Sequence, residues 1–144
     1  MPTDEEIKEK LNRGWIKSRM WFEVMASEKE TAEKTLKDHV AGMKKLKNTY
    51  ILNQKFEEAT EVKNPPRDLK QAFSKVAEVE FLSKDIESML FAVIYFGPSG
   101  VEILEPKKLN VGIETIQAIM NSVADVMHRF AAGGAGGIVV AAKR

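Results

Sequence analysis

The sequence contains no cysteine, and this absence excludes several kinds of chemistry. Without thiols the chain cannot form disulfide bonds, act through a cysteine nucleophile or offer a thiolate to a metal ion. The absence is compatible with a reducing compartment.

A long hydrophobic run is missing as well. The longest apolar run extends only from Met89 to Phe96, whereas a membrane-spanning helix needs about 20 apolar residues. The first residues, from Met1 to Glu6, are largely polar and acidic, unlike a signal peptide. We therefore expect a soluble, cytoplasmic protein that does not insert into a membrane.

Neither sign of charge predominates in the chain. The net charge is +1 over 144 residues, and basic and acidic side chains are nearly balanced in both halves. Because nucleic-acid-binding proteins usually carry a basic excess or stripe, nucleic acid is not expected as a partner. The proportions of hydrophobic (44%) and charged (30%) residues are typical of a globular domain.

Motifs for catalysis or metal binding are not found. His39 and His128 are the two histidines, and neither has another histidine at ligand spacing. Asp125 and His128 share a predicted helix face, but two ligands do not make a metal site. The serines have no base adjacent in sequence. No catalytic, metal-binding or cofactor-binding residue is assigned, no cofactor is expected, and a non-enzymatic role is favoured while an enzyme stays open.

Two similar stretches organise the chain. Residues 22–27 and 79–83 each alternate apolar and polar positions, end on a serine and run into a helical pattern. They predict strands over 15–26 and 75–82, each with one buried face. Ser27 and Ser83 are expected to cap the following helices, the first of them in a capping box with Glu30.

Other patterns predict the remaining elements. Thr3 and Glu6 match a capping box at the start of a helix. The other predicted elements are a helix at 4–13, helices from Ser27 to about Leu46 and from Ser83 to Gly97, a half-polar strand at 49–62 with Tyr50, Leu52, Phe56 and Val62 at alternate positions, a short helix at 66–74, a strand at 101–105 and a helix at 111–131 opened by Asn110.

The order of these elements resembles the ferredoxin-like split βαβ fold. We therefore expect an α+β protein with a four-stranded antiparallel sheet and two helices on one face. The resemblance rests on topology alone and implies no function. The predicted parts are an N-terminal helical extension (1–14), the ferredoxin-like core (15–106), a C-terminal helix (107–132) and a Gly-rich tail (133–144), in which residues 138–140 either stay flexible or add to a sheet edge.

The sheet face opposite the two helices is expected to be open. By parity, Lys17, Arg19 and Trp21 lie on this face beside Glu78 and Glu80. We interpret these charges as cross-strand pairs that stabilise the sheet. RNA binding through Arg19 and Trp21 is a weak alternative, because the two glutamates would repel phosphate.

The last helix carries the clearest functional signal. Apolar residues recur at intervals of three and four, as in the seam of a coiled coil or helix bundle. They are Ile113, Ile116, Met120, Val123, Met127 and Phe130. Left in water, six such side chains would forgo on the order of 10 kcal/mol of burial. The stripe must therefore cover the open sheet face of its own chain or pair with another copy.

These observations predict a protein that forms a homo-oligomer through its C-terminal helix and binds a protein or small-molecule partner at the interface. One alternative is a small enzyme, or a subunit of an enzyme complex, with a pocket between the sheet and the last helix. Its candidate titratable groups are Glu78, Glu80, Asp125 and His128.

Overall fold

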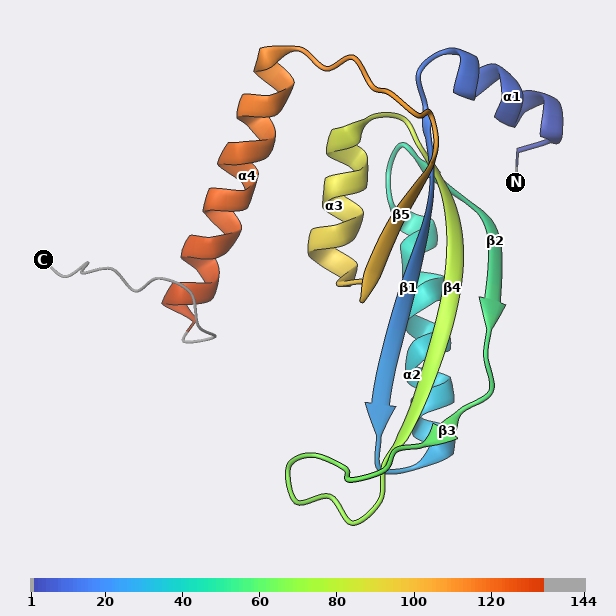
Figure 1. The fold of residues 1–144 in the computed structure, drawn as a ribbon, viewed down its shortest axis with the longest axis vertical. Helices are drawn as coiled ribbons and strands as arrows, with labels where there is room; N and C mark the ends of the chain where they lie inside the picture. Colours follow the sequence, from blue (N-terminus) through green and yellow to red (C-terminus); the bar gives the residue numbers. More distant parts are fainter. Residues whose placement is uncertain (1, 134–144) are drawn as a thin grey trace, which may run out of the picture. The chain divides into compact units, whose positions relative to one another are not determined.

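A computed structural model describes residues 2–133 and shows an α+β protein (Figure 1). The chain divides into two compact units after Lys108. The elements of the first unit are α1 (Asp4–Asn12), β1 (Ile16–Ala26), α2 (Lys29–Gly42), the 3-10 helix η1 (Met43–Lys45), β2 (Thr49–Phe56), β3 (Thr60–Glu61), β4 (Phe73–Ser83), α3 (Ile86–Phe96) and β5 (Gly100–Glu105). The second unit contains α4 (Ile113–Ala132).

The strands of the first unit form one open antiparallel sheet. Its order is β2-β4-β1-β5, and the short β3 pairs with β4. The long strands β1 and β4 occupy the centre, with Met20 opposite Val79 and Arg19 opposite Glu80. β2 and β5 are therefore the outer strands among the residues described.

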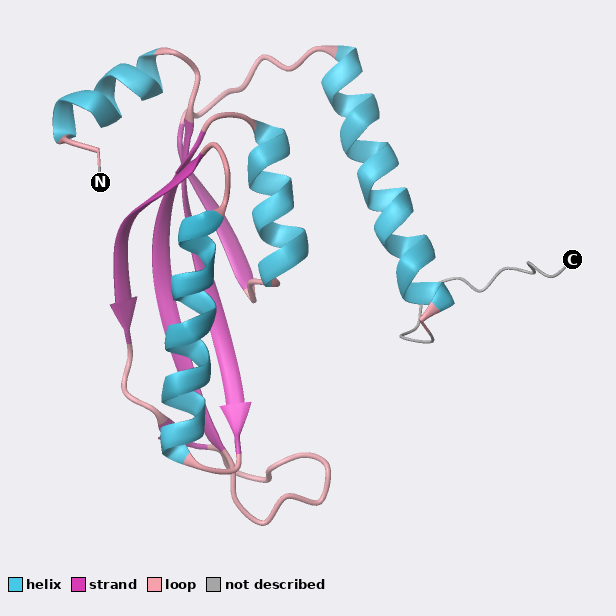
Figure 2. Ribbon diagram, turned by 180° about the vertical axis from the view of Figure 1, so that it is seen from behind, coloured by secondary structure: helices cyan, strands magenta, loops and turns pink. Residues whose placement is uncertain are grey.

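Helices α2 and α3 lie together on one face of this sheet (Figure 2). The period-two pattern of the strands and the three-to-four spacing of the helices direct their apolar side chains into this layer. The core cluster comprises Ile16, Met20, Phe22, Leu36, Val40, Met43, Ala77, Val79, Phe81, Met89 and Ala92. The predicted alternation of both central strands is confirmed, since each buries every second residue over most of its length.

The helix starts were predicted less well than the strands. The capping box of Thr3 and Glu6 is present, and the hydrogen bond from the Thr3 backbone N–H is the main cause that lowers the pKa of the Glu6 carboxyl. The caps expected at Ser27 and Ser83 are wrong. Helix α2 begins after Glu28 without a side-chain cap, and Asp85 caps α3 by accepting a hydrogen bond from the Ser88 N–H at 2.9 Å.

Ser83 is part of strand β4 because the sheet holds it from both sides. It lies opposite Ile16 of β1 and Thr49 of β2. The helix can start only after this double pairing ends, and Asp85 is the first acceptor side chain beyond it.

The region between α2 and β4 also differs from expectation. The single strand predicted over 49–62 is split into β2 and β3, and a register shift lies between Ile51 and Asn53. Thr49 is buried, whereas Tyr50 and Phe56 are exposed.

The short helix predicted over 66–74 does not form. Arg67 and Asp68 have positive φ angles of 57° and 59°, which a right-handed helix does not accommodate. Phe73 and Ser74 pair with β1 on one side and β3 on the other. These long-range pairings override the local helical spacing.

The second unit begins with a short linker and continues as α4. The helix starts at Ile113, two residues later than the start predicted at 111, and Gly112 before it provides no side-chain cap. Of the predicted Gly-rich tail at 133–144, all but Gly133 lies outside the described residues. None of the helices described is both long and apolar enough to cross a membrane.

Candidate functional site

Arg19 is the centre of a charged cluster on the sheet face opposite α2 and α3. Its Nη2 donates to Glu80 Oε2 at 3.2 Å, and its Nη1 donates to Glu102 Oε1 at 3.2 Å. Its Nε lies 3.7 Å from Glu78 Oε2. One guanidinium therefore joins carboxylates from both strands that flank β1, since Glu78 and Glu80 belong to β4 and Glu102 to β5.

The predicted residues of this face are brought together by the strand register. Trp21 lies opposite Glu78, and its Nε1 donates to Glu78 Oε1 at 3.2 Å. Lys17 Nζ lies 4.0 Å from Glu80 Oε1. The five residues named from the sequence, with Glu102 added, form what we call the Arg19 cluster: Lys17, Arg19, Trp21, Glu78, Glu80 and Glu102.

The electrostatics of the cluster suit stabilisation of the sheet. The hydrogen bond to Glu80, and the charges of the three glutamates, raise the pKa of Arg19 further above its usual range. The guanidinium is thus a permanent charge with fixed partners, not a group that exchanges protons near neutral pH. Because Arg19 and Lys17 already face carboxylates, this geometry does not favour phosphate binding.

Trp21 is positioned by a close approach of the neighbouring strand. A Cβ atom at Gly100 would lie 3.3 Å from Trp21 Cε3, so a larger residue there would push the indole aside. The backbone oxygen of Trp21 accepts from the Ser99 N–H at 2.7 Å, which ties the start of β5 to β1. The indole is therefore held by β4 on one side and by β5 on the other.

One member of the Arg19 cluster was missed in the sequence. Glu102 has the same outward parity in β5 as the glutamates have in β4, and this alternation with Val101 and Ile103 was a usable signal.

A second cluster joins α1 to the edge of the sheet. Trp15 stacks on Tyr50 with ring centroids 5.8 Å apart, and Lys10 Nζ lies 4.3 Å from the centroid of the Trp15 ring.

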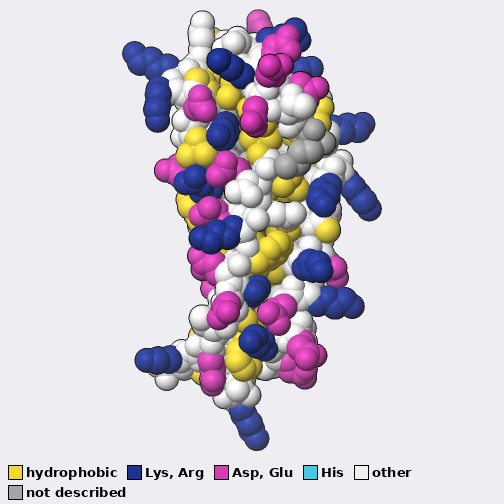
Figure 3. All heavy atoms as spheres, turned by 90° about the vertical axis from the view of Figure 1, so that its right-hand side faces the viewer, with side chains coloured by type: hydrophobic (Ala, Val, Ile, Leu, Met, Phe, Trp, Pro, Cys, Tyr) yellow, Lys and Arg dark blue, Asp and Glu magenta, His cyan; other side chains and the backbone are white. Residues whose placement is uncertain are grey.

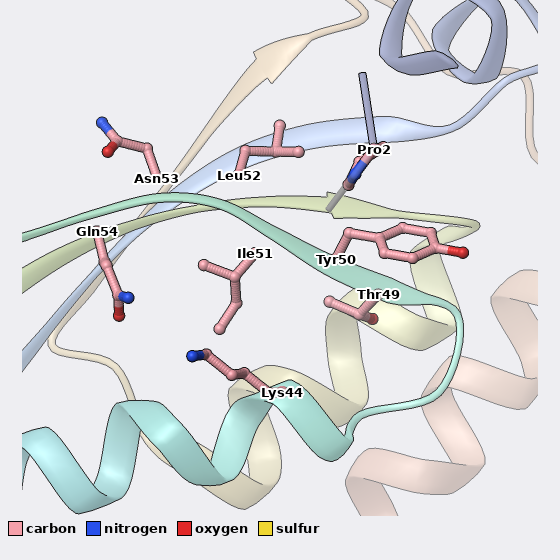
Figure 4. A pocket seen from close by; sticks show the side chains of 8 residues that line it. All are labelled: Pro2, Lys44, Thr49, Tyr50, Ile51, Leu52, Asn53 and Gln54. Atoms are coloured by element: carbon pink, nitrogen blue, oxygen red, sulfur yellow. The ribbon is translucent and has the colours of Figure 1, made fainter. Parts of the chain in front are cut away.

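A hollow of about 470 Å³ runs along the outer strand β2 (Figure 4). In the close-up, Ile51 and Gln54 lie on the side of Lys44, while Leu52 and Asn53 lie on the other side of the strand. The hollow follows backbone that pairs only with β4 among the described residues. Its volume and its single charged lining residue suit a small ligand or an extended peptide. On this side of the molecule, basic and acidic side chains are interspersed (Figure 3).

His39 makes a structural contact, whereas His128 is exposed on α4. His39 Nε2 lies 2.8 Å from the carbonyl oxygen of Phe96 at the end of α3, so it links the two helices on the sheet. Asp125 pairs with Arg129 at 2.7 Å, one turn further along α4. Within residues 2–133 no group of three or more metal-ligating side chains comes together.

The six residues of the predicted oligomer interface all belong to α4. They lie along one side of the helix, and none of its residues is buried. We call this set, from Ile113 to Phe130, the α4 stripe. Helix α4 alone provides no surface against which its apolar side can pack.

The chain belongs to the MJ0538 family, which it matches over residues 17–144. The match begins inside β1 and so leaves out α1. It includes the sheet, α2, α3 and α4. Comparison with curated proteins and with solved structures found no match.

Proposed function

We propose that this member of the MJ0538 family forms a homo-oligomer through α4 and binds a protein or small-molecule partner at the resulting interface. The α4 stripe is the observation that carries this proposal. It contains six large apolar side chains at intervals of three and four on a helix of 20 residues. This spacing suits contact between helices better than contact between a helix and a sheet.

Exposure of the α4 stripe to water is unfavourable. Burying about six large apolar side chains contributes on the order of 10 kcal/mol. That contribution is large beside the stability of an ordinary domain, which is about 5–15 kcal/mol. A second copy supplies an apolar partner of matching length, because its own α4 presents the same stripe.

We extend the proposal to the fold class of the first unit and to the cellular location of the protein. We assign the first unit to the ferredoxin-like split βαβ class. The strand order β2-β4-β1-β5, with both α2 and α3 on one face, supports this assignment. We place the protein in the cytoplasm, and the lack of cysteine is compatible with that reducing compartment.

Light scattering coupled to gel filtration tests the proposal. We expect the wild-type protein to have the mass of a dimer or larger oligomer. Met120→Glu and Met127→Glu place a charge in the stripe, so each variant should give monomer or aggregate. Asn121→Glu introduces the same side chain on the opposite side of α4 and should leave the oligomer intact. A wild-type monomer would contradict the proposal.

A further inference from the structure

The outer edge of β2 carries a hollow that neither the core nor the Arg19 cluster uses. Every residue from Thr49 to Gln54 lines it, together with Lys44 and Pro2. Successive residues of a strand point to opposite faces of the sheet, so a hollow on one face would contact only alternate residues. A hollow that six consecutive residues line must therefore follow the edge of the strand.

The two sides of this edge belong to different faces of the sheet. Lys44 comes from η1, which continues the covered face after α2, and it lies on the same side of β2 as Ile51 and Gln54 (Figure 4). Tyr50 lies on the opposite face, where it stacks on Trp15. The hollow is therefore bordered by side chains on both sides of the strand.

The charges beside the hollow are positive. Lys44 is its single charged lining residue, is exposed and takes part in no ion pair among residues 2–133. On the other face, Lys10 Nζ lies 5.4 Å from the centroid of the Tyr50 ring. One ammonium group thus lies on each side of the strand edge, and an occupant that carries carboxylates would complement both.

The bulge in β2 favours a short occupant without a fixed fold. The pairing register shifts between Ile51 and Asn53, so Leu52 is an extra residue in the strand. A bulge bends its strand and interrupts the ladder, which protects the edges of sheets against pairing with one another. The β2 strand of a second copy would bring the same bend and could not pair along the whole edge, whereas a peptide can follow it.

The last residues of the chain itself match the hollow poorly in charge. They end in Lys143 and Arg144, two cationic side chains against a single terminal carboxylate. Beside Lys44 and Lys10 these cations would be repelled. The charge of the hollow therefore favours a segment of another protein.

We propose that the edge of β2 binds an extended, acidic peptide segment of another protein. The peptide adds to β2 as a further strand, and main-chain hydrogen bonds supply much of its affinity. Because its successive side chains point to opposite faces, neighbouring acidic residues meet Lys44 on one face and Lys10 on the other. The site lies wholly in the first unit and does not depend on self-association through α4.

Titration of the isotope-labelled, full-length protein with a synthetic peptide tests the inference by NMR. The probe is the hexapeptide Thr-Glu-Glu-Val-Glu-Thr, acetylated and amidated so that its ends carry no charge. We expect the amide resonances of residues 49–54 to shift, while those of β5 at the other edge of the sheet stay unchanged. The same peptide with lysine in place of each glutamate should bind about tenfold more weakly or worse.

N-methylated peptides separate strand addition from simple attraction between charges. Two versions of the probe carry N-methyl groups on one or the other set of alternate backbone amides, with all side chains unchanged. Only one set of amides can face β2, so one version should bind about tenfold more weakly than the other. Equal binding of both methylated peptides and the unmodified probe would overturn the inference, because the hollow would then accept any small acidic ligand.

A change in the protein tests the same contact from the other side. Lys44→Glu should weaken binding of the acidic probe by about five- to tenfold, because it turns an attraction into a repulsion. Lys34→Glu is the matched control, since it changes the net charge equally at an exposed position of α2 outside the hollow. Circular dichroism verifies that both variants stay folded, and equal losses in the two variants would contradict a local contact.

The remaining outcomes identify other occupants. Failure of the acidic probe to bind overturns the inference, and so does tighter binding by a peptide of residues 134–144, which would assign the edge to the chain itself. Shifts of the same resonances on dilution of the protein alone would assign it to a second copy and also overturn it. A wild-type monomer, by contrast, would remove the proposed function and leave peptide binding at β2 standing.

Discussion

The two faces of the sheet use the same strands in opposite ways. On the face covered by α2 and α3, Met20 lies opposite Val79 and both are fully buried. One residue away, Arg19 lies opposite Glu80 on the other face and the two form an ion pair at 3.2 Å. Moving one residue along β1 thus changes an apolar contact into an ionic one.

The two faces therefore contribute differently to the stability of the sheet and to the register of its strands. The covered face supplies most of the hydrophobic free energy, because burial of apolar area is the largest favourable contribution to folding. The charged face contributes less free energy of folding, since its groups are partly exposed. Its ion pairs nevertheless form in only one alignment of the strands. A shift by one residue would bury Arg19 and expose Met20, so both faces oppose it.

The largest expected effect comes from a cavity on the covered face. Phe81 is fully buried in β4 and meets Phe22 edge to face at 6.3 Å. Phe81→Ala should lower the free energy of unfolding by about 3–5 kcal/mol. Phe56→Ala at the exposed end of β2 is the control and should change it far less. Urea denaturation followed by circular dichroism measures both, and equal losses would refute the contrast between the covered and exposed positions.

A smaller effect is expected from the charged face. Arg19→Met removes the shared partner of Glu78, Glu80 and Glu102 and leaves their carboxylates to repel one another. We expect a lower melting temperature that is partly restored by salt, because ions screen this repulsion. Arg13→Met is the matched control.

Arg13 forms a single ion pair with Glu9 on the exposed surface of α1. Such pairs contribute little to stability, so its removal should have almost no effect. If thermal denaturation at low and high salt shows the same response for the Arg13 and Arg19 variants, the Arg19 cluster has no special role in the sheet.

The smallest effect tests a polar residue on the covered face. The hydroxyl of Ser18 is buried without a hydrogen-bond partner. Ser18→Ala should therefore stabilise the protein by about 1 kcal/mol, as measured by urea denaturation, because an unpaired polar group is removed from the interior. Ser99→Ala is the comparison, since the Ser99 hydroxyl donates to the Trp21 backbone oxygen at 3.3 Å and its loss should slightly destabilise. A loss of stability in Ser18→Ala would show that its hydroxyl is satisfied.

Much of the sheet could be predicted because its signal is local. The alternation in 15–26 and 75–82 decides which side chains share a face, whatever the rest of the chain does. The charged residues of the Arg19 cluster follow from the same parity. Glu102 was missed although its strand carried the same alternation.

The predictions that were wrong, for Ser83 and for residues 66–74, share a different cause. Ser83 has the local signature of a helix cap, but Ile16 and Thr49 pair with it on both sides and keep it in the strand. Residues 66–74 have helical spacing, yet pairing of Phe73 with β1 makes the end of this segment a strand. In both places, partners more than ten residues away in sequence determine the local structure.

The sequence by itself determined the α+β composition, the two faces of each central strand and the apolar stripe on the last helix, because all three are periodic patterns within one segment. Only the tertiary structure decided that three glutamates from two strands meet on Arg19, and that Ser83 stays in the sheet between Ile16 and Thr49. Those features depend on strand order and register. Order and register are set by which elements pack together, and that choice minimises the free energy of the whole chain rather than of any single segment.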